Sequence, residues 1–354
     1  MPAGRFLDSP WGRPYNSAMP DPAAPVELYP LRMKEVFRKT PWGGNGLRKS
    51  LGKKCPAKTG ESWELSVRAG AESVVVNGPY KGKKLTDLLR KWPRELLGDE
   101  HAMRFSERFP LLVKFLAVHD RMSLQVHPSD EFAQRYETEG VGKMEAWYVL
   151  SAPKGCRVIR GVLPGTTVAE FRQQLEKGNV EQCLNVMDVK PGDVIFIPPG
   201  TIHSAFGGVV LFEVQQNSDL TYRLTDWGRP GLDGKKRALH VEKALTVTDF
   251  YSMGVSKYKA SRIPGFSYRR YLLIKCEKFT LESIQMARGR IKDHTNATRF
   301  GIYSIVTGKG KFVIHGGKQS VPFSRGETYF IPARLGPFEI VTPGAGEIVV
   351  SYVE

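Results

Sequence analysis

The sequence predicts a mainly β protein built from two β-barrels of the jelly-roll type, with a few short helices. Its 354 residues include 36 Gly and 24 Pro, and many of these lie in short turn clusters between β-branched runs, which favours strands over a helical bundle. Many short strands at this spacing are typical of barrels and jelly rolls. One strand–turn–strand pattern occurs twice, which indicates two related barrels.

The repeated pattern begins at Gly192 and again at Gly326. The first copy, "GDVIFIPPGTIH", ends at His203. The second copy, "GETYFIPARLGP", keeps the first glycine and the proline at the same spacing. In it an arginine replaces the second glycine, and Pro337 stands where the histidine would be. Only the first barrel is therefore expected to use this histidine.

The chain is predicted to divide into an extension and two units. Residues 1–27 are rich in Pro, Ala and small polar residues, so we expect them to be poorly ordered or to lie as a strap over the surface. Residues 28–255 are predicted to form the first barrel with helical insertions. Residues 265–354 are predicted to form a second, degenerate barrel, after a linker, "SKYKASRIPG".

Alternation of apolar and polar residues predicts the strands of the first unit. They lie within residues 29–49, 61–68, 72–78, 110–120, 122–128, 144–152, 156–163, 184–189, 193–199 and 209–216. Helices are predicted at 85–98, with Thr86 as N-cap and a break at Pro93, at 131–137 after Ser129, at 167–179, and near 240–247. Strands of the second unit are predicted within 271–283, 300–316, 327–333 and 346–354.

Composition restricts the compartment and the partners. The four cysteines show no CxxC spacing, so a disulfide framework is not expected and a reducing cytoplasm is the predicted location. No apolar run is long enough for a membrane span. The net charge of +16 is spread along the whole chain, so charge alone does not separate a nucleic-acid partner from a generally basic surface that attracts an anionic small molecule. No nucleic-acid or membrane partner is expected. No oligomeric state is predicted.

The stretch "SLQVHP" (123–128) carries the first part of a candidate metal site. Period two places Gln125 and His127 on one face of a strand. Glu145 in "GKMEAWYVL" adds a carboxylate, and His203 ends a pattern, Gly-x5-Pro-x-Gly-x2-His, that is a signature of the cupin barrel. Each residue alone has an ordinary structural explanation, but together they suit one divalent cation inside a barrel, with Gln125 contributing Oε1. Zinc is favoured, with iron, cobalt or manganese as alternatives. We interpret His294, in the second barrel, as structural.

Six motifs resemble, in order, those of the type I phosphomannose isomerases. They are "WGGNGL" (42–47), "TGESWEL" (59–65), "SLQVHP" (123–128), "GKMEAWYVL" (142–150), "PPGTIHS" (198–204) and "QQNSDLTYRLTDWGR" (215–229). The spacing is similar to that of the short bacterial form, which lacks a large helical insertion. Ser62 and Ala146 stand where many relatives have cysteine.

The resemblance implies interconversion of mannose 6-phosphate and fructose 6-phosphate with a bound zinc ion, one per chain. It assigns the metal ligands to Gln125, His127, Glu145 and His203. It assigns catalysis to Arg223 and contacts with the sugar phosphate to Ser123 and Lys143.

Aldose–ketose isomerisation moves a proton between C1 and C2 through a cis-enediol, so charge develops on the sugar oxygens. A metal and the guanidinium of Arg223 would stabilise that charge. Three candidates remain for the proton carrier, namely Glu61, Glu213 and a water on the metal.

Two other classes of function remain open at this point. An iron-dependent cupin oxygenase would use the same ligands, but it leaves Lys143 and Arg223 unexplained. A non-catalytic sugar-binding or regulatory cupin, or a basic nucleic-acid binder, is the other class.

Overall fold

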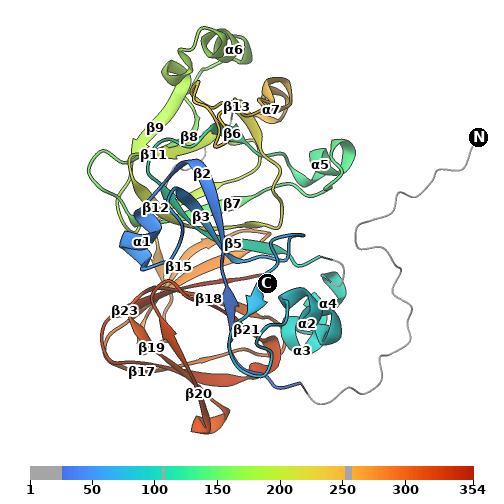
Figure 1. Cartoon of the computed structure of the whole chain (residues 1–354), viewed down its shortest axis with the longest axis vertical. Coiled ribbons are helices and arrows are strands. Elements are labelled where there is room, and N and C mark those ends of the chain that lie inside the picture. The colour runs from blue at the N-terminus through green and yellow to red at the C-terminus, as the bar shows by residue number, and fades with distance from the viewer. Residues whose placement is uncertain (1–25, 106–107, 252–256) are drawn as a thin grey trace, which may run out of the picture.

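The computed structural model describes residues 26–105, 108–251 and 257–354. Figure 1 shows two β-rich units stacked along the long axis of the molecule. The predicted extension at 1–27 lies outside the described residues except for its last two. No helix among the described residues is long and apolar enough to cross a membrane.

The first unit contains a six-stranded and a five-stranded sheet. The six-stranded sheet has the order β10 (Val194–Ile197), β7 (Glu145–Ser151), β12 (Val209–Gln216), β5 (Leu111–Val118), β2 (Val36–Gly44), β3 (Thr59–Leu65). The five-stranded sheet has the order β13 (Tyr222–Thr225), β6 (Leu124–Val126), β11 (His203–Phe206), β8 (Arg157–Val162), β9 (Leu184–Asp188).

The second unit contains an eight-stranded and a four-stranded sheet. The eight-stranded sheet has the order β14 (Ser261–Arg262), β15 (Arg269–Lys275), β16 (Thr280–Met286), β23 (Gly346–Tyr352), β18 (Gly301–Thr307), β21 (Thr328–Ile331), β1 (Leu31–Lys34), β4 (Val74–Val75). The four-stranded sheet has the order β17 (Gly289–His294), β22 (Pro337–Thr342), β19 (Lys309–Ile314), β20 (Gln319–Ser324).

The strand orders confirm the internal repeat. The order β10-β7-β12-β5 in the first unit matches β21-β18-β23-β16 in the second, and β6-β11-β8-β9 matches β17-β22-β19-β20. The hydrogen-bonded ladders do not close, so each jelly roll is a pair of open sheets. The predicted boundary at 255–265 remains a prediction. However, β1 and β4 come from the expected first unit and pair within the eight-stranded sheet, where Leu31 lies opposite Phe330.

The central strands of the six-stranded sheet are buried on both faces. Every residue of β5 and of β12 is buried. Side chains on one face, such as Phe115 and Phe212, share a hydrophobic core with Leu281 and Ile348 of the eight-stranded sheet. The opposite face looks into the first unit, and there Lys114 interrupts the apolar β5 and Glu213 interrupts the apolar run of β12 that ends at Val214. Continuous apolar runs are the sequence signature of strands covered on both faces.

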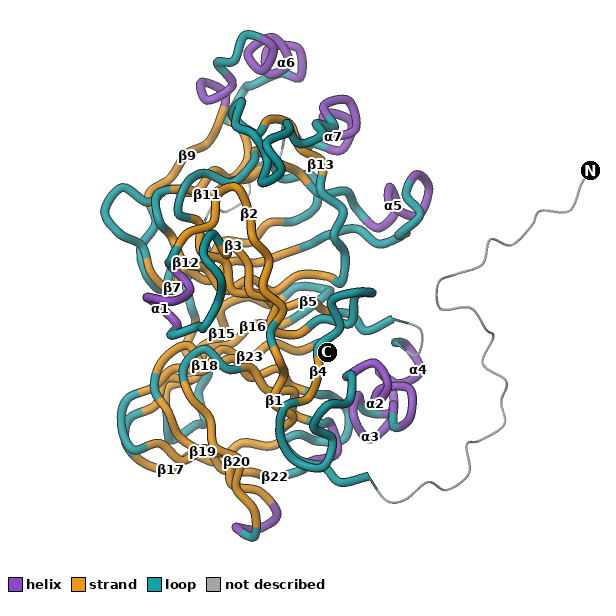
Figure 2. The backbone as a smooth tube through the Cα atoms, viewed as in Figure 1, coloured by secondary structure: helices purple, strands orange, loops and turns teal. Residues whose placement is uncertain are grey.

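Short helices lie at the periphery (Figure 2). They are α1 (Gly46–Leu51), α2 (Leu85–Lys91), α3 (Pro93–Leu97), α4 (Asp99–Arg104), α5 (Asp130–Tyr136), α6 (Val168–Glu176) and α7 (Val241–Val247), with 3-10 turns at Val180–Cys183, His315–Gly317 and Ala333–Leu335. The Ser129 hydroxyl caps α5 by accepting from Phe132 N–H at 3.2 Å. The Thr86 prediction was wrong: α2 begins one residue earlier and Lys84 is its N-cap, while Pro93 opens α3 as expected for its fixed φ.

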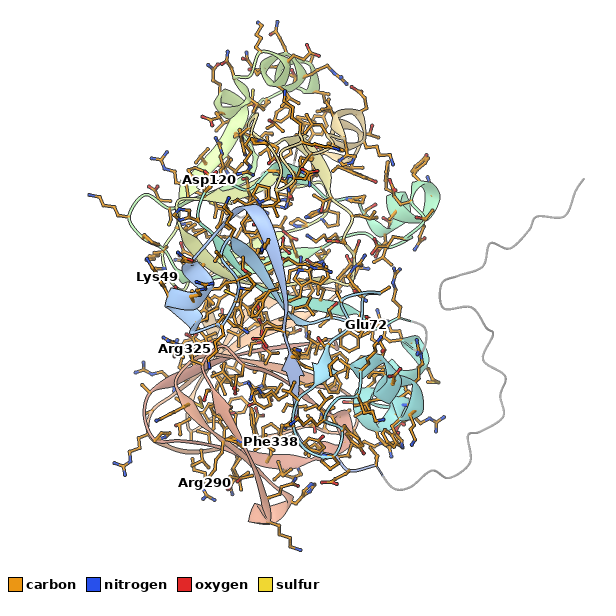
Figure 3. The ribbon with its side chains drawn as sticks, viewed as in Figure 1. Lys49, Glu72, Asp120, Arg290, Arg325 and Phe338 are labelled. Atoms are coloured by element: carbon orange, nitrogen blue, oxygen red, sulfur yellow. The ribbon has the colours of Figure 1, made fainter. Side chains whose placement is uncertain are left out.

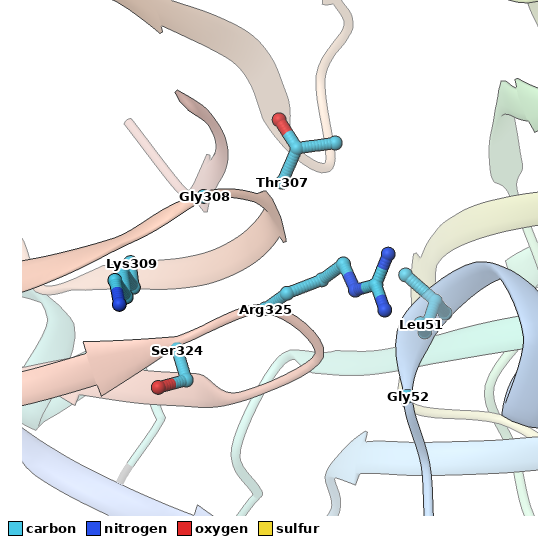
Figure 4. A pocket seen from close by; sticks show the side chains of 7 residues that line it. All are labelled: Leu51, Gly52, Thr307, Gly308, Lys309, Ser324 and Arg325. Carbon is cyan, nitrogen blue, oxygen red and sulfur yellow. The ribbon is translucent and has the colours of Figure 1, made fainter. Parts of the chain in front are cut away.

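A surface cavity of about 470 Å³ lies where the two units meet. Leu51 and Gly52 line it from the first unit, and Thr307, Lys309 and Arg325 line it from the second (Figure 4). None of the predicted site residues lines this cavity, so it is separate from the candidate site.

The interior of the second unit holds a buried ion network. Arg270 donates to Glu282 at 2.6 Å and to Asp293 at 3.1 Å. Tyr352 O–H donates to the same glutamate, and Tyr303 O–H donates to the same aspartate, both at 2.8 Å. All five side chains are buried.

Replacing Arg270 with alanine leaves two buried carboxylates without their cation. We expect Arg270→Ala to lower the free energy of unfolding by about 3–5 kcal/mol. Arg290→Ala is the control, because Arg290 (Figure 3) pairs with Glu339 while 60% exposed, and it should cost below about 1 kcal/mol. Urea denaturation of both variants checks this. Equal midpoints would contradict the structural role of the network.

Candidate metal centre and active site

Three neighbouring strands of the five-stranded sheet bring predicted site residues into one row. Gln125 on β6 lies opposite His203 on β11 and opposite Arg223 on β13. Directly opposed residues of antiparallel strands project to the same face. The alternating Leu124 and Val126 pack in the core cluster that includes α7 residues. The polar face of "SLQVHP" therefore looks into the first unit.

The facing sheet contributes Lys143, Glu145 and Trp147 from β7 and the segment before it. Glu145 Oε2 lies 3.4 Å from His127 Nε2, and Glu145 Oε1 lies 3.3 Å from His203 Nε2. The candidate ligand atoms of these three residues all lie within 4.8 Å of one another, and all three side chains are buried. The structure thus joins residues that are 18 to 76 positions apart in the sequence (from 127 to 145 and from 127 to 203).

Backbone carbonyls orient both imidazoles. His127 Nδ1 lies 2.8 Å from the carbonyl of Leu220, and His203 Nδ1 lies 2.8 Å from the carbonyl of Thr201. Because a carbonyl only accepts, each Nδ1 carries the proton and each Nε2 presents a lone pair toward Glu145. A carbonyl holding the second ring nitrogen is the usual support for a metal-binding histidine. The donor set of two imidazoles and a carboxylate fits a divalent cation.

The Lys143 ammonium balances the negative charge of Glu145 in the structure. Its Nζ lies 2.6 Å from Glu145 Oε2 and 3.0 Å from His127 Nε2. Burial would raise the pKa of Glu145, but the Lys143 ammonium and the neighbouring His127 and His203 together outweigh it and hold that pKa well below its usual range. Burial and the same ammonium lower the pKa of His127 to about 3, and burial lowers the pKa of His203. Both rings are therefore neutral at neutral pH, as metal ligation requires.

Gln125 lies beside the group, but its amide is turned differently from the prediction. Nε2 lies 3.1 Å from His203 Nε2, while Oε1 accepts from the Ser123 hydroxyl at 3.2 Å. A half-turn of the amide would exchange the two atoms, and the serine oxygen can also accept from an amide N–H. Ligation through Gln125 Oε1 remains a prediction.

Arg223 lies at the end of the row. Its Nη1 donates to the carbonyl of Ala238 at 2.9 Å, and its backbone N–H to His240 Nδ1 at 3.2 Å. Its Nε is buried and has no hydrogen-bond partner among the described residues. A donor of this kind is available to an oxygen of a bound molecule.

Comparisons with known proteins agree with this geometry. Residues 30–146 match the family described as phosphomannose isomerase type I, catalytic domain, and residues 270–353 match the mannose-6-phosphate isomerase cupin domain. The chain is 33% identical to mannose-6-phosphate isomerase ManA of Bacillus subtilis over 325 residues, covering 92% of this chain and 99% of that protein. The chain belongs to the type I phosphomannose isomerase family.

Further relatives of this phosphomannose isomerase family agree in sequence and in structure. The mannose-6-phosphate isomerase of Streptococcus mutans is 33% identical, with 91% of this chain and 98% of that protein covered. The crystal structure of the mannose 6-phosphate isomerase from Bacillus subtilis superimposes with a TM-score of 0.82 at 31% identity, covering 92% of this chain and 99% of that one. The resemblance noted in the sequence and the cupin fold are thereby confirmed.

The sequence reasoning missed Lys114, which lies next to the site of this isomerase-family chain. Lys114 Nζ lies 3.0 Å from Glu213 Oε1 and 3.8 Å from Glu61 Oε2. Trp147 Nε1 donates to Glu213 Oε2 at 2.7 Å. Burial would lower the pKa of Lys114, but the glutamates outweigh it and raise that pKa. The signal was a lysine in the middle of "LLVKFLAV", a strand that is otherwise almost wholly apolar.

The second unit does not reproduce the metal-site residues. His294 pairs with Pro337, as Gln125 pairs with His203, but both of these residues of the second unit are exposed. The inward positions are taken by Asp293 and Phe338, one residue away from the positions that the repeat predicts. Asp293 is already neutralised by Arg270.

Removing one imidazole tests the metal centre. We expect His203→Ala to lose most of its bound metal, because it deletes one of the three side chains, His127, Glu145 and His203, whose ligand atoms lie together. His294→Ala is the matched control and should keep its metal. Elemental analysis of the purified variants measures both. A His203→Ala protein with full metal content would contradict the site.

Proposed function

We propose that this chain is an aldose–ketose isomerase that interconverts mannose 6-phosphate and fructose 6-phosphate with the help of a divalent metal ion. The observation that carries the proposal is the buried group of His127, Glu145 and His203, of which His203 lies in one row with Gln125 and Arg223. The printed names of the relatives supply the substrate.

Zinc is the proposed metal, and His127, Glu145, His203 and Gln125 are its proposed ligands. Imidazole and carboxylate donors suit zinc, although other borderline divalent ions accept the same set. Bound there, the cation would polarise the sugar oxygens at C1 and C2. The four free cysteines of the chain lie outside the ligand set, and their reduced state supports a cytoplasmic location.

Arg223 is proposed to stabilise negative charge on the sugar during enolisation. Its guanidinium stays protonated, so it acts as a fixed donor instead of a base. The buried Nε without a partner is the donor that would face a developing oxyanion. A preorganised donor of this kind costs no rearrangement when the charge forms.

Glu213 is the proposed proton carrier among the candidates that the sequence left open. It lies opposite Trp147 on the neighbouring strand, and Trp147 shares its face with Glu145. Burial raises the pKa of Glu213 and Lys114 opposes the rise, which suits exchange of a proton near neutral pH. Glu61 also approaches Lys114, but its backbone lies on β3, three strands and about 14 Å from β7 in the same sheet, whereas Glu213 lies on the strand next to β7.

Ser123 and Lys143 are the proposed contacts to the sugar phosphate. Lys143 has an ion pair with Glu145 and a contact with His127. A cation held by those two side chains would replace the ammonium as their partner, and Lys143 would then be available to a phosphate oxygen. The oxygenase and the sugar-binding alternatives give no role to Arg223 or to the Lys114–Glu213 pair.

A coupled assay before and after chelation tests the function. We expect turnover of mannose 6-phosphate by the purified protein, loss of that turnover on chelation, and recovery when zinc is added back, because the ligand group is then refilled. Elemental analysis follows the metal in the same samples. Oxygen consumption without isomerisation, or full turnover in metal-free protein, would reject the proposal.

Replacing one carboxylate tests the proton carrier. We expect Glu213→Gln to lower kcat by about 10²- to 10⁴-fold, since general base catalysis contributes an effect of this size. Metal content should stay unchanged. Glu61→Gln is the comparison, and its loss should be much smaller. A larger loss at Glu61 than at Glu213 would reverse the assignment.

A further inference from the structure

Asp130 lies three residues after His127, at the first position of α5, and joins three parts of the molecule. Its Oδ1 accepts from the backbone N–H of Gly142 at 2.8 Å and from Gln216 Nε2 at 3.0 Å. Its Oδ2 lies 2.7 Å from Lys278 Nζ. Lys278 lies between β15 and β16, in the second unit, whereas the other partners belong to the first (Figure 1).

The 141–144 segment, which carries Lys143, is held from both sides. The backbone N–H of Lys143 donates to the carbonyl of Pro128 at 3.1 Å, and that of Met144 donates to Gln216 Oε1 at 2.9 Å. In turn, the backbone N–H of Gln216 donates to the carbonyl of Met144 at 3.0 Å. The Ser218 hydroxyl donates to the carbonyl of Val141 at 2.8 Å.

Gly142 permits the close approach between this segment and Asp130. A Cβ atom at position 142 would lie 2.5 Å from the backbone nitrogen of Asp130 and 2.7 Å from the carbonyl oxygen of Pro128. Such distances are shorter than any van der Waals contact. The backbone of Gly142 is therefore pressed against the turn that follows the metal-binding strand.

The ion pair between Asp130 and Lys278 is well placed to hold this arrangement. The two side chains are 24% and 27% exposed, so water screens them less than it would a surface pair. Burial would raise the pKa of Asp130, but the bonds from Lys278 and Gly142 outweigh it and lower that pKa. A charged acceptor also strengthens its bond to a backbone N–H.

We propose that Asp130 and Lys278 are positioning residues through which the second unit fixes the 141–144 segment, and with it Lys143, in the active site. Neither residue contacts the metal-binding group in the structure. This inference rests on the proposed function only for its kinetic consequence. It gives the second unit, whose interior lacks the ligand set, a direct part in shaping the site of the first.

The experiment compares Lys278→Met with Arg334→Met. Arg334 of the second unit pairs with Asp99 of the first at 2.9 Å, far along the sequence from the 141–144 segment, so its variant loses another ion pair between the units, a more exposed one, without touching the site. Hydrogen exchange of the amides of Gly142 and Lys143 is measured on the full-length proteins. We expect exchange about five- to tenfold faster in Lys278→Met and unchanged in Arg334→Met, since one hydrogen-bonded ion pair is worth about this factor.

Kinetics with mannose 6-phosphate provide the second measurement. Lys278→Met should raise KM about three- to tenfold, because the contact between Lys143 and the bound substrate is weakened. The contact is equally weakened in the transition state, so kcat should stay nearly constant, and so should the metal content. Lys278→Arg should restore the wild-type KM. In a Lys143→Met background, Lys278→Met should have no further effect on KM, because both changes act through the same side chain.

The outcomes separate this inference from the proposed function. Unchanged exchange at Gly142 and Lys143 overturns the positioning role, whatever the activity of the protein. Faster exchange without any isomerase activity supports the positioning role and rejects the proposed function. Additive effects of the Lys143 and Lys278 substitutions on KM would also overturn the inference, because Lys278 would then act by another route.

Discussion

The first unit is organised around a buried negative charge that must be neutralised. Glu145 is fully buried, and both of its oxygens lie within 3.4 Å of imidazole nitrogens that present lone pairs. Acceptors facing acceptors repel one another in a medium of low dielectric constant, so the group is stable only with a positive charge among its members. Lys143 supplies that charge in the structure, and a divalent cation would supply more of it.

The sheets supply the geometry that this charge requires. The six-stranded sheet has neighbours on both faces, and it presents Glu145, Glu213 and Lys114 to the interior of the first unit from adjacent strands. The five-stranded sheet presents His203, Gln125 and Arg223 to the same interior from the opposite side. Because each polar residue lies on a strand whose other face is packed in a core, a slip of one residue would bury the wrong side chains. Packing energy therefore fixes the register of the site residues.

Local sequence patterns predicted the parts of the site that depend on a single strand or turn. Period two placed Gln125 and His127 on one face, and the glycine–proline turn led to His203. The patterns did not predict contacts that depend on pairing between distant strands. Lys114 could be placed beside Glu213 only when β5 and β12 were known to be neighbours, and nothing near Lys278 indicates Asp130 as its partner. The shift that puts Phe338, and not Pro337, inside the second unit is likewise a matter of register.

Both units contain buried carboxylates that need a positive charge nearby, and each unit obtains that charge from a different kind of side chain. In the first, the neutralising charge is the Lys143 ammonium, which lies on the segment before β7 and pairs with Glu145, and a metal ion bound by Glu145 would take its place. In the second, Asp293 and Glu282 are neutralised by the guanidinium of Arg270, which stays protonated and is bound by both carboxylates. The neutralising charge of the second unit is therefore part of the chain itself, whereas that of the first lies beside residues that suit a metal ion. The Asp130–Lys278 ion pair joins the two units next to the loop that carries Lys143, so movement of Lys278 would be passed directly to that loop.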